Sequence, residues 1–270
     1  MKRFRVKLIA FILLILLLYG CAGNKATSTT NEEKETEIYV FIAASLSNAM
    51  TELADRYAKL QPYVKITYNV DSSGTLQMQI GEGAECDLFF SAAMKQMTTL
   101  KDEGYVEAAS IKSLLENKIV LIKPAVTKTK VTGFENLYEA SSIALAGESV
   151  PVGSYTRELL QNLGIWDKVQ ETEINECSNV TAVLAAVSEG SNEVGVVYET
   201  DANSMKDLVE VIAIAPEDSV SSPVVYPAGL VINQEADEAQ KQAAKDFLEF
   251  LTSEEAMSVF IKYGFTIYKQ

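Results

Sequence analysis

The length, charge and composition of the chain exclude several classes of function at once. Its 270 residues, 48% of them hydrophobic, are suited to two lobes rather than to one small core. The formal net charge of -14 argues against nucleic acid as a partner, because phosphate backbones select basic surfaces. The complete absence of histidine excludes Ser-His and Cys-His nucleophile pairs and histidine-based metal sites.

The N-terminus predicts export from the cytoplasm. Residues 1–20 combine a positive start (Lys2, Arg3, Arg5 and Lys7), an apolar run and Tyr19-Gly20, which is the order of a secretory signal peptide. The apolar run is too short for a comfortable membrane span. Cys21 follows it in a pattern that looks like a bacterial lipobox, so we expect Cys21 to be lipidated. Tyr19 is unusual in that pattern, and an uncleaved N-terminal anchor is the alternative. Both alternatives place the folded part outside the cytoplasm, held to the cell membrane.

Residues 21–36 are polar and lack apolar periodicity, which predicts a flexible tether between lipid and domain. A chain that begins at Cys21 loses four positive charges and no negative ones, so it carries a net charge of -18. We interpret this acidity as an aid to solubility. Cys86 and Cys177 remain as the two cysteines that could pair, and the sequence leaves their pairing open.

Strand and helix patterns then alternate along the chain. In the first half, strands are expected at 37–44, 64–70 and around DLFF (87–90). Helices are expected at 46–60, from about Thr75, and around Met94 to Leu100. In the second half, strands are expected at KIVLIKP (118–124), SIALAG (142–147), near Glu173, at VGVVY (194–198), at LVEVIAIA (208–215) and at VVYPAGLVIN (224–233). Helices are expected at 155–163, 180–187, 238–251 and 254–263.

This alternation predicts an α/β fold with mostly parallel sheets. Two extended segments, 118–124 and 224–233, lie where the pattern changes from one half to the other. We therefore expect residues 37–120 and 226–270 to form a first lobe and residues 121–225 a second. The two lobes would be joined by two crossing strands, with a cleft at the hinge.

No catalytic or nucleotide-binding motif accompanies this fold. The sequence has no GxSxG, Ser-x-x-Lys, GxGxxG or GxxxxGK[ST] pattern. Its many carboxylates fall on predicted helix faces and loops, where they are solvated. Binding therefore fits the sequence better than catalysis, and we expect neither enzymatic activity nor a cofactor.

Candidate binding residues instead lie where predicted strands are followed by helices. Ser45 and Ser73 lie at two such junctions in the first half, and Val152 and Val180 lie at helix starts in the second. Serine is a common N-cap, so capping alone explains the serines. The sharper interpretation is anion binding, because the free N–H groups and dipole of a helix N-terminus favour negative charge. Tyr198 closes an apolar strand, where its ring could pack in the core or its hydroxyl could face a cleft.

Six segments, taken in order, resemble the molybdate-binding components of ABC importers: SLSNAM, SSGTL, DLFFSAA, VPVGSY, GVVYETDA and KYGFTI. The resemblance extends from about Glu37 to Gln270. It implies a type II periplasmic-binding-protein fold with helices on both faces of the sheets. It further implies a ligand that is a tetrahedral oxyanion, molybdate or tungstate, rather than a free metal cation. A membrane ABC permease is the implied partner, and a monomer is expected.

The resemblance also implies a site made only of neutral donors. Ser45 and Ser73 would bind through hydroxyl and backbone N–H groups, Val152 and Val180 through backbone N–H groups, and Tyr198 through its hydroxyl. Asp71 departs from the family pattern, in which small neutral residues precede the serine pair, and we expect its carboxylate to point away from the ligand. A receptor for another small anion, such as sulfate or an organic acid, is the alternative. Such a receptor would use a cation in the cleft, and among the motifs that carry the five candidate residues only VPVGSY adjoins one, Arg157.

Overall fold

The computed structural model describes residues 35–269, with the side chain of Glu217 excepted. The predicted signal peptide, Cys21 and most of the predicted tether lie outside these described residues. The two remaining cysteines, Cys86 and Cys177, are both buried and both free, so they do not form a disulfide. Among residues 35–269, no helix is long and apolar enough to cross a membrane.

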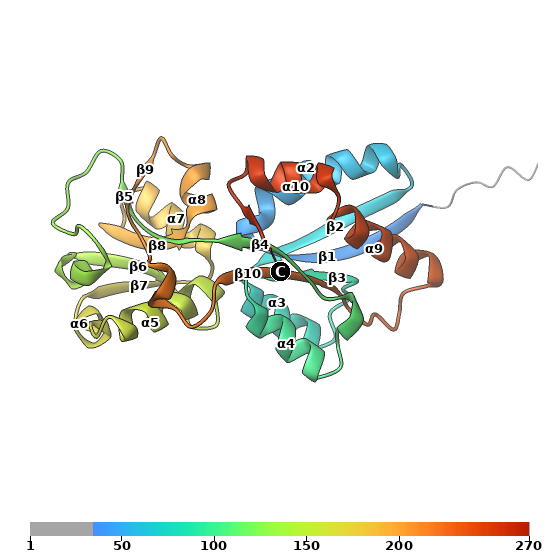
Figure 1. Ribbon diagram of the computed structural model, residues 1–270, viewed down its shortest axis with the longest axis horizontal. Coiled ribbons are helices and arrows are strands. Elements are labelled where there is room, and N and C mark those ends of the chain that lie inside the picture. The colour runs from blue at the N-terminus through green and yellow to red at the C-terminus, as the bar shows by residue number, and fades with distance from the viewer. Residues whose placement is uncertain (1–34, 270) are drawn as a thin grey trace, which may run out of the picture. The chain divides into compact units, whose positions relative to one another are not determined.

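The first of two sheets has six strands in the order β11-β4-β10-β3-β1-β2. Helices cover it on both faces, with α2 and α10 on one side and α3 and α4 on the other (Figure 1). We call this sheet with its helices lobe I. Its strands are β1 (Thr36–Ala43), β2 (Val64–Asp71), β3 (Leu88–Phe90), β4 (Lys112–Asn117), β10 (Val224–Leu230) and β11 (Thr266–Ile267). Its helices are η1 (Ala44–Leu46), α2 (Ser47–Leu60), α3 (Ser73–Gly81), α4 (Met94–Asp102), η2 (Ala108–Ser110), α9 (Glu238–Phe250) and α10 (Glu254–Lys262).

The second sheet has five strands in the order β7-β6-β8-β5-β9, and with its helices it forms lobe II. In Figure 1, α5 and α6 lie on one side of this sheet and α7 and α8 on the other. Its strands are β5 (Ile119–Pro124), β6 (Ser142–Ala146), β7 (Glu173–Cys177), β8 (Val194–Tyr198) and β9 (Val209–Ile214). Its helices are η3 (Phe134–Glu139), α5 (Pro151–Asn162), α6 (Trp166–Gln170), α7 (Val180–Ser188), α8 (Glu199–Ser204) and η4 (Glu217–Ser219).

The expected α/β class with two sheets is confirmed, but the sheets are mixed rather than mostly parallel. Neighbours are parallel where a helix connects the strands, as in β1/β2, β1/β3, β6/β7 and β6/β8. Strands β5 and β10 pair antiparallel with both of their neighbours. These are the strands that begin just after the chain has passed from one sheet to the other. Each therefore enters its sheet from the end opposite to its neighbours, which the alternation of patterns did not reveal.

Local sequence explains most element boundaries. Helix α2 buries Ala49, Met50, Leu53 and Tyr57, a spacing that puts one apolar stripe against the sheet. Helix α3 begins at Ser73 because Ser72 caps it, with its hydroxyl accepting a hydrogen bond from Thr75 N at 3.1 Å. The strands β5 and β8 are almost wholly buried, β1 is buried at five of its eight residues, and all three consist mainly of β-branched and other apolar residues, as expected for strands covered on both faces.

Candidate functional site

A small cavity lies where the two lobes meet. Its volume is about 10 Å³, about the space of one water molecule, and residues of both sheets line it. None of the described residues around it is a lysine, arginine, aspartate or glutamate. The five positions singled out from the sequence all belong to this lining. The full set is Ala43, Ala44, Ser45, Ser72, Ser73, Ala92, Val150, Pro151, Val152, Val180 and Tyr198.

Helix N-termini converge on the cavity. Ser73 is the first residue of α3, Val152 the second of α5 and Val180 the first of α7, while Ser45 lies in the 3-10 turn that leads into α2. The first N–H groups of a helix have no acceptor within the helix, and the helix dipole places partial positive charge there. The cavity therefore has a positive character without containing a charged side chain, which is the setting that an anion requires.

A backbone N–H group in the segment that follows strand β3 orients the Ser73 hydroxyl. Its Oγ accepts a hydrogen bond from Ala92 N at 2.9 Å, and the Ser73 side chain is 1% exposed. Because Ser72, not Ser73, caps helix α3, the Ser73 hydroxyl hydrogen is not needed for the helix. It remains available to a group in the cavity.

The Ser45 hydroxyl ends a short chain of hydrogen bonds. Asn117 Nδ2 donates to Tyr226 Oη at 3.2 Å, and Tyr226 Oη lies 2.9 Å from Ser45 Oγ. Since the Tyr226 oxygen already accepts from the amide, its own hydrogen can be donated to Ser45 Oγ. The Ser45 hydrogen is then left for the cavity.

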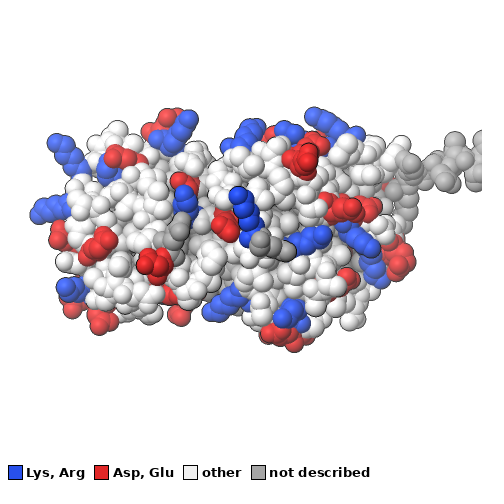
Figure 2. Space-filling view, viewed as in Figure 1, with Lys and Arg blue, Asp and Glu red and all other residues white. Residues whose placement is uncertain are grey.

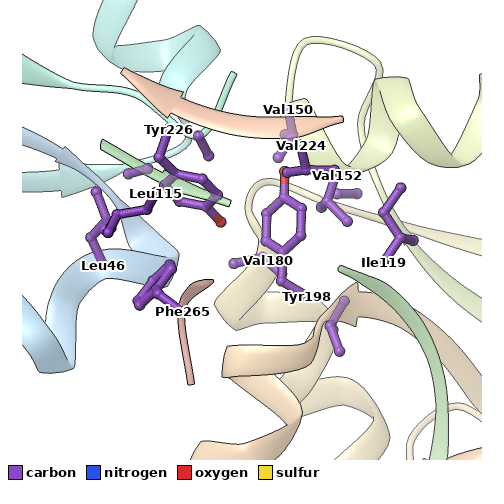
Figure 3. Packing of buried hydrophobic residues seen from close by; sticks show 14 of the residues in the cluster. Leu46, Leu115, Ile119, Val150, Val152, Val180, Tyr198, Val224, Tyr226 and Phe265 are labelled. Atoms are coloured by element: carbon purple, nitrogen blue, oxygen red, sulfur yellow. The ribbon is translucent and has the colours of Figure 1, made fainter. Parts of the chain in front are cut away.

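Tyr198 presents a buried hydroxyl that has no hydrogen-bond partner among the described residues. The side chain is 1% exposed, and an unpaired hydroxyl at such depth costs about 1–3 kcal/mol. Burial raises the pKa of Tyr198 well above its ordinary value, so the hydroxyl stays protonated and can donate. Figure 3 shows the ring beside Val150, Val152 and Val180, facing Tyr226 across the junction of the lobes, with ring centroids 5.8 Å apart. The ring is thus packed as a core residue would be, while its oxygen lines the cavity.

Asp201 is a buried carboxyl close to the two tyrosines. Its Oδ2 accepts a hydrogen bond from the backbone N–H of Tyr198 at 3.3 Å, which anchors the start of α8. Burial raises the pKa of Asp201 to about 7, and its charge also raises the pKa values of Tyr198 and Tyr226. Asp201 does not line the cavity itself.

The cation that follows the motif VPVGSY, Arg157, is bound elsewhere. Arg157 donates from Nη1 to the carbonyls of Ala146 and Gly153, and from Nη2 to Glu176 at 2.9 Å. Its guanidinium also lies over the ring of Trp166, 5.5 Å from the centroid. These contacts hold it away from the cavity, whose lining does not include it.

Asp71 is also turned away from the cavity, as expected. Its Oδ1 accepts hydrogen bonds from Ser72 N at 2.6 Å and from Asn179 Nδ2 at 3.4 Å. Asn179 at the same time caps α7, with its Oδ1 accepting from Ala182 N at 3.0 Å. The carboxylate is thereby held against donors at the edge of the site rather than inside it.

Three residues around the site were not found from the sequence: Asn117, Tyr226 and Asp201. Asn117 and Tyr226 lie on β4 and β10, far from every motif, and reach Ser45 only through the folded chain. Asp201 lies within GVVYETDA, but its neighbour Glu199 has the same charge, and nothing local indicates which of the two is buried.

Comparisons with known proteins agree with this fold. Residues 38–266 match the family model described as bacterial extracellular solute-binding protein. A Bacillus subtilis protein, YvgL, provisionally named an ABC transporter substrate-binding lipoprotein, is 42% identical, with 96% of each chain covered. The molybdate-binding protein ModA of Escherichia coli is 34% identical, over 93% of this chain and 97% of its own.

A solved structure is similar as well. The substrate-binding domain of a provisionally named molybdenum ABC transporter from Clostridium difficile has a TM-score of 0.65 and 35% identity. The alignment covers 87% of this chain and all of that domain. Since the family match extends across both lobes, the chain belongs to the bacterial extracellular solute-binding proteins, which are transport proteins of ABC systems and not enzymes.

Proposed function

We propose that this protein captures molybdate or tungstate outside the cell and delivers it to an ABC importer. The observation that carries the proposal is the buried, unpaired hydroxyl of Tyr198 in a cavity that offers only uncharged donors. A fully ionised oxyanion would accept that hydrogen bond and remove the cost of leaving it unmade. The similarity to ModA proteins supports the same ligand.

The expected affinity follows from the number of donors. A dianion that enters the cavity loses its hydration, and only convergent hydrogen bonds replace it. Charge-assisted hydrogen bonds contribute about 1.5–3 kcal/mol each. About five to seven of them, after desolvation and closure, leave roughly -8 to -12 kcal/mol, which corresponds to a dissociation constant between micromolar and nanomolar.

A donor-only site also selects among oxyanions. Monohydrogen phosphate carries a proton that needs an acceptor, and leaving that proton unpaired costs about 1–3 kcal/mol. The hydroxyl oxygens of Ser72 and Ser73 each already accept one backbone N–H group, which leaves each oxygen one lone pair for such a proton. Sulfate is fully ionised like molybdate and would have to be rejected by its smaller size. Sulfate or an organic acid is therefore the competing ligand in this proposal.

The proposal includes how the protein is held and how it closes. Cys21 would carry the lipid anchor, as the lipoprotein name of YvgL supports. Residues 37–120 with 226–270 would move against residues 121–225 about the two crossing segments. The pocket lined by Ser45, Ser73, Val152, Val180 and Tyr198 would widen as the lobes move apart, admit the anion and close around it, and the closed monomer would dock on its permease.

Isothermal titration calorimetry of three serine variants tests the site. Ser45→Ala and Ser73→Ala should each weaken molybdate binding at least tenfold, because each loses a donor to the ligand. Ser258→Ala is the matched control, since Ser258 is exposed on α10 and its hydroxyl donates to the carbonyl of Glu255 in the same helix. Melting temperatures of the free proteins check that the variants fold. Unchanged affinity in both cavity variants would rule out the proposed site.

A thermal-shift panel identifies the ligand. We expect molybdate and tungstate to raise the melting temperature strongly and phosphate to leave it almost unchanged. A larger shift with sulfate or with an organic acid than with molybdate would replace the proposed ligand by that anion.

A further inference from the structure

Gly74 lies at a point where the backbones of the two lobes nearly touch. It is the second residue of α3 in lobe I and is buried. A Cβ atom built on Gly74 would lie 2.1 Å from the carbonyl oxygen of Ser149 and 2.9 Å from the carbonyl carbon. Ser149 belongs to lobe II, in the turn between β6 and α5. Since both atoms are backbone, no side-chain rotation could make room for even a methyl group.

The helix itself does not explain a glycine at this position. Gly74 has no positive φ, so any residue could adopt its backbone conformation. Glycine inside a helix is about 1 kcal/mol less favourable than alanine. Glycine at position 74 therefore makes helix α3 less stable than alanine would. The close approach of Ser149 explains why glycine is present there.

The contact is next to the groups that would hold the ligand. Gly74 follows Ser73 directly, and Ser149 precedes Val152 by three residues in a turn bonded to the start of α5. A second contact between the lobes lies just before Ser73 and Val180, where Asn179 Nδ2 donates a hydrogen bond to Asp71 Oδ1 at 3.4 Å. The lobes thus touch immediately beside both sets of donors.

We propose that Gly74 determines how far the two lobes close and hence how tightly the oxyanion is held. The missing side chain allows α3 to advance until it meets the Ser149 carbonyl, and this backbone contact sets the distance between Ser73 on one side and Val152 on the other. A methyl group at position 74 holds the lobes apart, so the donors of one lobe no longer reach an anion held by the other. This inference rests on the proposed function, because it takes the cavity to be the ligand site.

Two glycine substitutions in the same helix test the inference. Gly74→Ala adds the methyl group at the contact, while Gly81→Ala adds it at a position where a Cβ atom meets nothing within 4 Å. Both positions lack a positive φ, so neither substitution strains the backbone. We expect Gly74→Ala to weaken molybdate binding at least tenfold in calorimetry, mostly through faster dissociation in stopped-flow experiments. Gly81→Ala should bind as the parent protein does.

Two further measurements separate closure from folding. Molybdate should contract the radius of gyration of the parent and of Gly81→Ala in small-angle scattering, and contract Gly74→Ala less. Both free variants should melt close to the parent temperature, because the lobes of Gly74→Ala can separate about the crossing segments without unfolding either sheet. Equal affinity of Gly74→Ala and Gly81→Ala would overturn the inference. A free Gly74→Ala protein that melts well below Gly81→Ala would overturn it too, since the glycine would then serve folding.

The choice of ligand keeps the two proposals distinguishable. Normal molybdate binding by Gly74→Ala would refute the role of Gly74 and leave the proposed function standing. If the parent binds a different anion in the thermal-shift panel, molybdate capture is refuted, and the same pair of variants compared with that anion still decides the role of Gly74. A parent protein that binds no anion would overturn both.

Discussion

The hydrogen bonds behind Ser45 decide how well this residue can donate. Tyr226 Oη lies 2.9 Å from Ser45 Oγ and accepts from Asn117 Nδ2 at 3.2 Å. In Tyr226→Phe this relay is lost, and the Ser45 hydroxyl is free to rotate away from the cavity. We expect molybdate affinity to fall about threefold to tenfold, less than in Ser45→Ala, as titration calorimetry would show.

The double variant checks that the two residues act together. Because Tyr226 would work through Ser45, Ser45→Ala with Tyr226→Phe should bind about as weakly as Ser45→Ala alone. Fully additive losses would show that Tyr226 affects the ligand by another route, such as packing against Tyr198.

Asp201 predicts a pH dependence of binding. Its folded pKa of about 7 is raised from an ordinary value of 3.8 because burial disfavours the charged form. As pH rises through 7, the carboxyl ionises near Tyr198 and Tyr226, which stay neutral, and its charge repels an anion in the cavity. Molybdate affinity should therefore fall by about threefold or more between pH 6 and pH 8, and Asp201→Asn should remove this fall in calorimetry.

The same carboxyl affects stability with a definite sign. The folded protein holds the Asp201 proton more tightly than the unfolded chain does, so this group makes the protein less stable as pH rises from about 4 to about 7. Asp201→Asn should raise the melting temperature most at pH 8 and least near pH 4. A gain that is the same at both pH values would contradict the buried-carboxyl explanation.

At the scale of residues, the sequence predicts what is adjacent along the chain. Ser45, Ser73, Val152, Val180 and Tyr198 all line one cavity, because each lies where a strand meets a helix and such ends gather at one edge of a sheet. The hydrogen bonds that connect Asn117, Tyr226 and Ser45 could not be predicted in this way. Tyr226 on β10 has the sequence surroundings of a core tyrosine, and its partner Ser45 lies 181 positions away.

Among the secondary-structure elements, the start of α7 connects stability with binding. Asn179 caps this helix through Ala182 N at 3.0 Å and contacts Asp71 across the lobes. Asn179→Ala should cost about 1 kcal/mol of stability and should also weaken molybdate binding, because the cap fixes the N–H of Val180. Chemical denaturation and calorimetry would measure the two effects.

A second helix cap provides the control. Ser253 caps α10 by accepting from Ala256 N at 3.1 Å and does not line the cavity. Ser253→Ala should lose a similar amount of stability with no loss of affinity. Equal effects of Ser253→Ala and Asn179→Ala on affinity would mean that general destabilisation, not the position of Val180, weakens binding.

Periodicity and capping signals predicted most elements, and they failed where pairing depends on distant segments. Strand β4 has a mixed burial pattern and was not expected, although it lies between β10 and β11 in the first sheet. The antiparallel pairing of β5 and β10 was also missed. The antiparallel directions of β5 and β10 follow from the passage of the chain between the two sheets. No local pattern in the sequence indicates the direction in which a strand enters its sheet.

At the scale of the whole molecule, charge opposes the first encounter with an anion. The chain carries a net charge of -14. Acidic and basic side chains are interspersed over the face seen in Figure 2. Salt screens this repulsion, since the Debye length shortens from about 30 Å at 0.01 M to about 8 Å at 0.15 M. The association rate constant for molybdate should therefore rise a few-fold over this range in stopped-flow experiments, and a rate that falls with salt would contradict it.

The central claim is that uncharged donors from both lobes hold a fully ionised tetrahedral oxyanion. A crystal structure of the protein with molybdate tests this most directly. The predicted result is an anion in the cavity between the lobes, within hydrogen-bond distance of Ser45, Ser73, Val152, Val180 and Tyr198. An anion in contact with a lysine or arginine side chain, or bound outside this cavity, would contradict the claim.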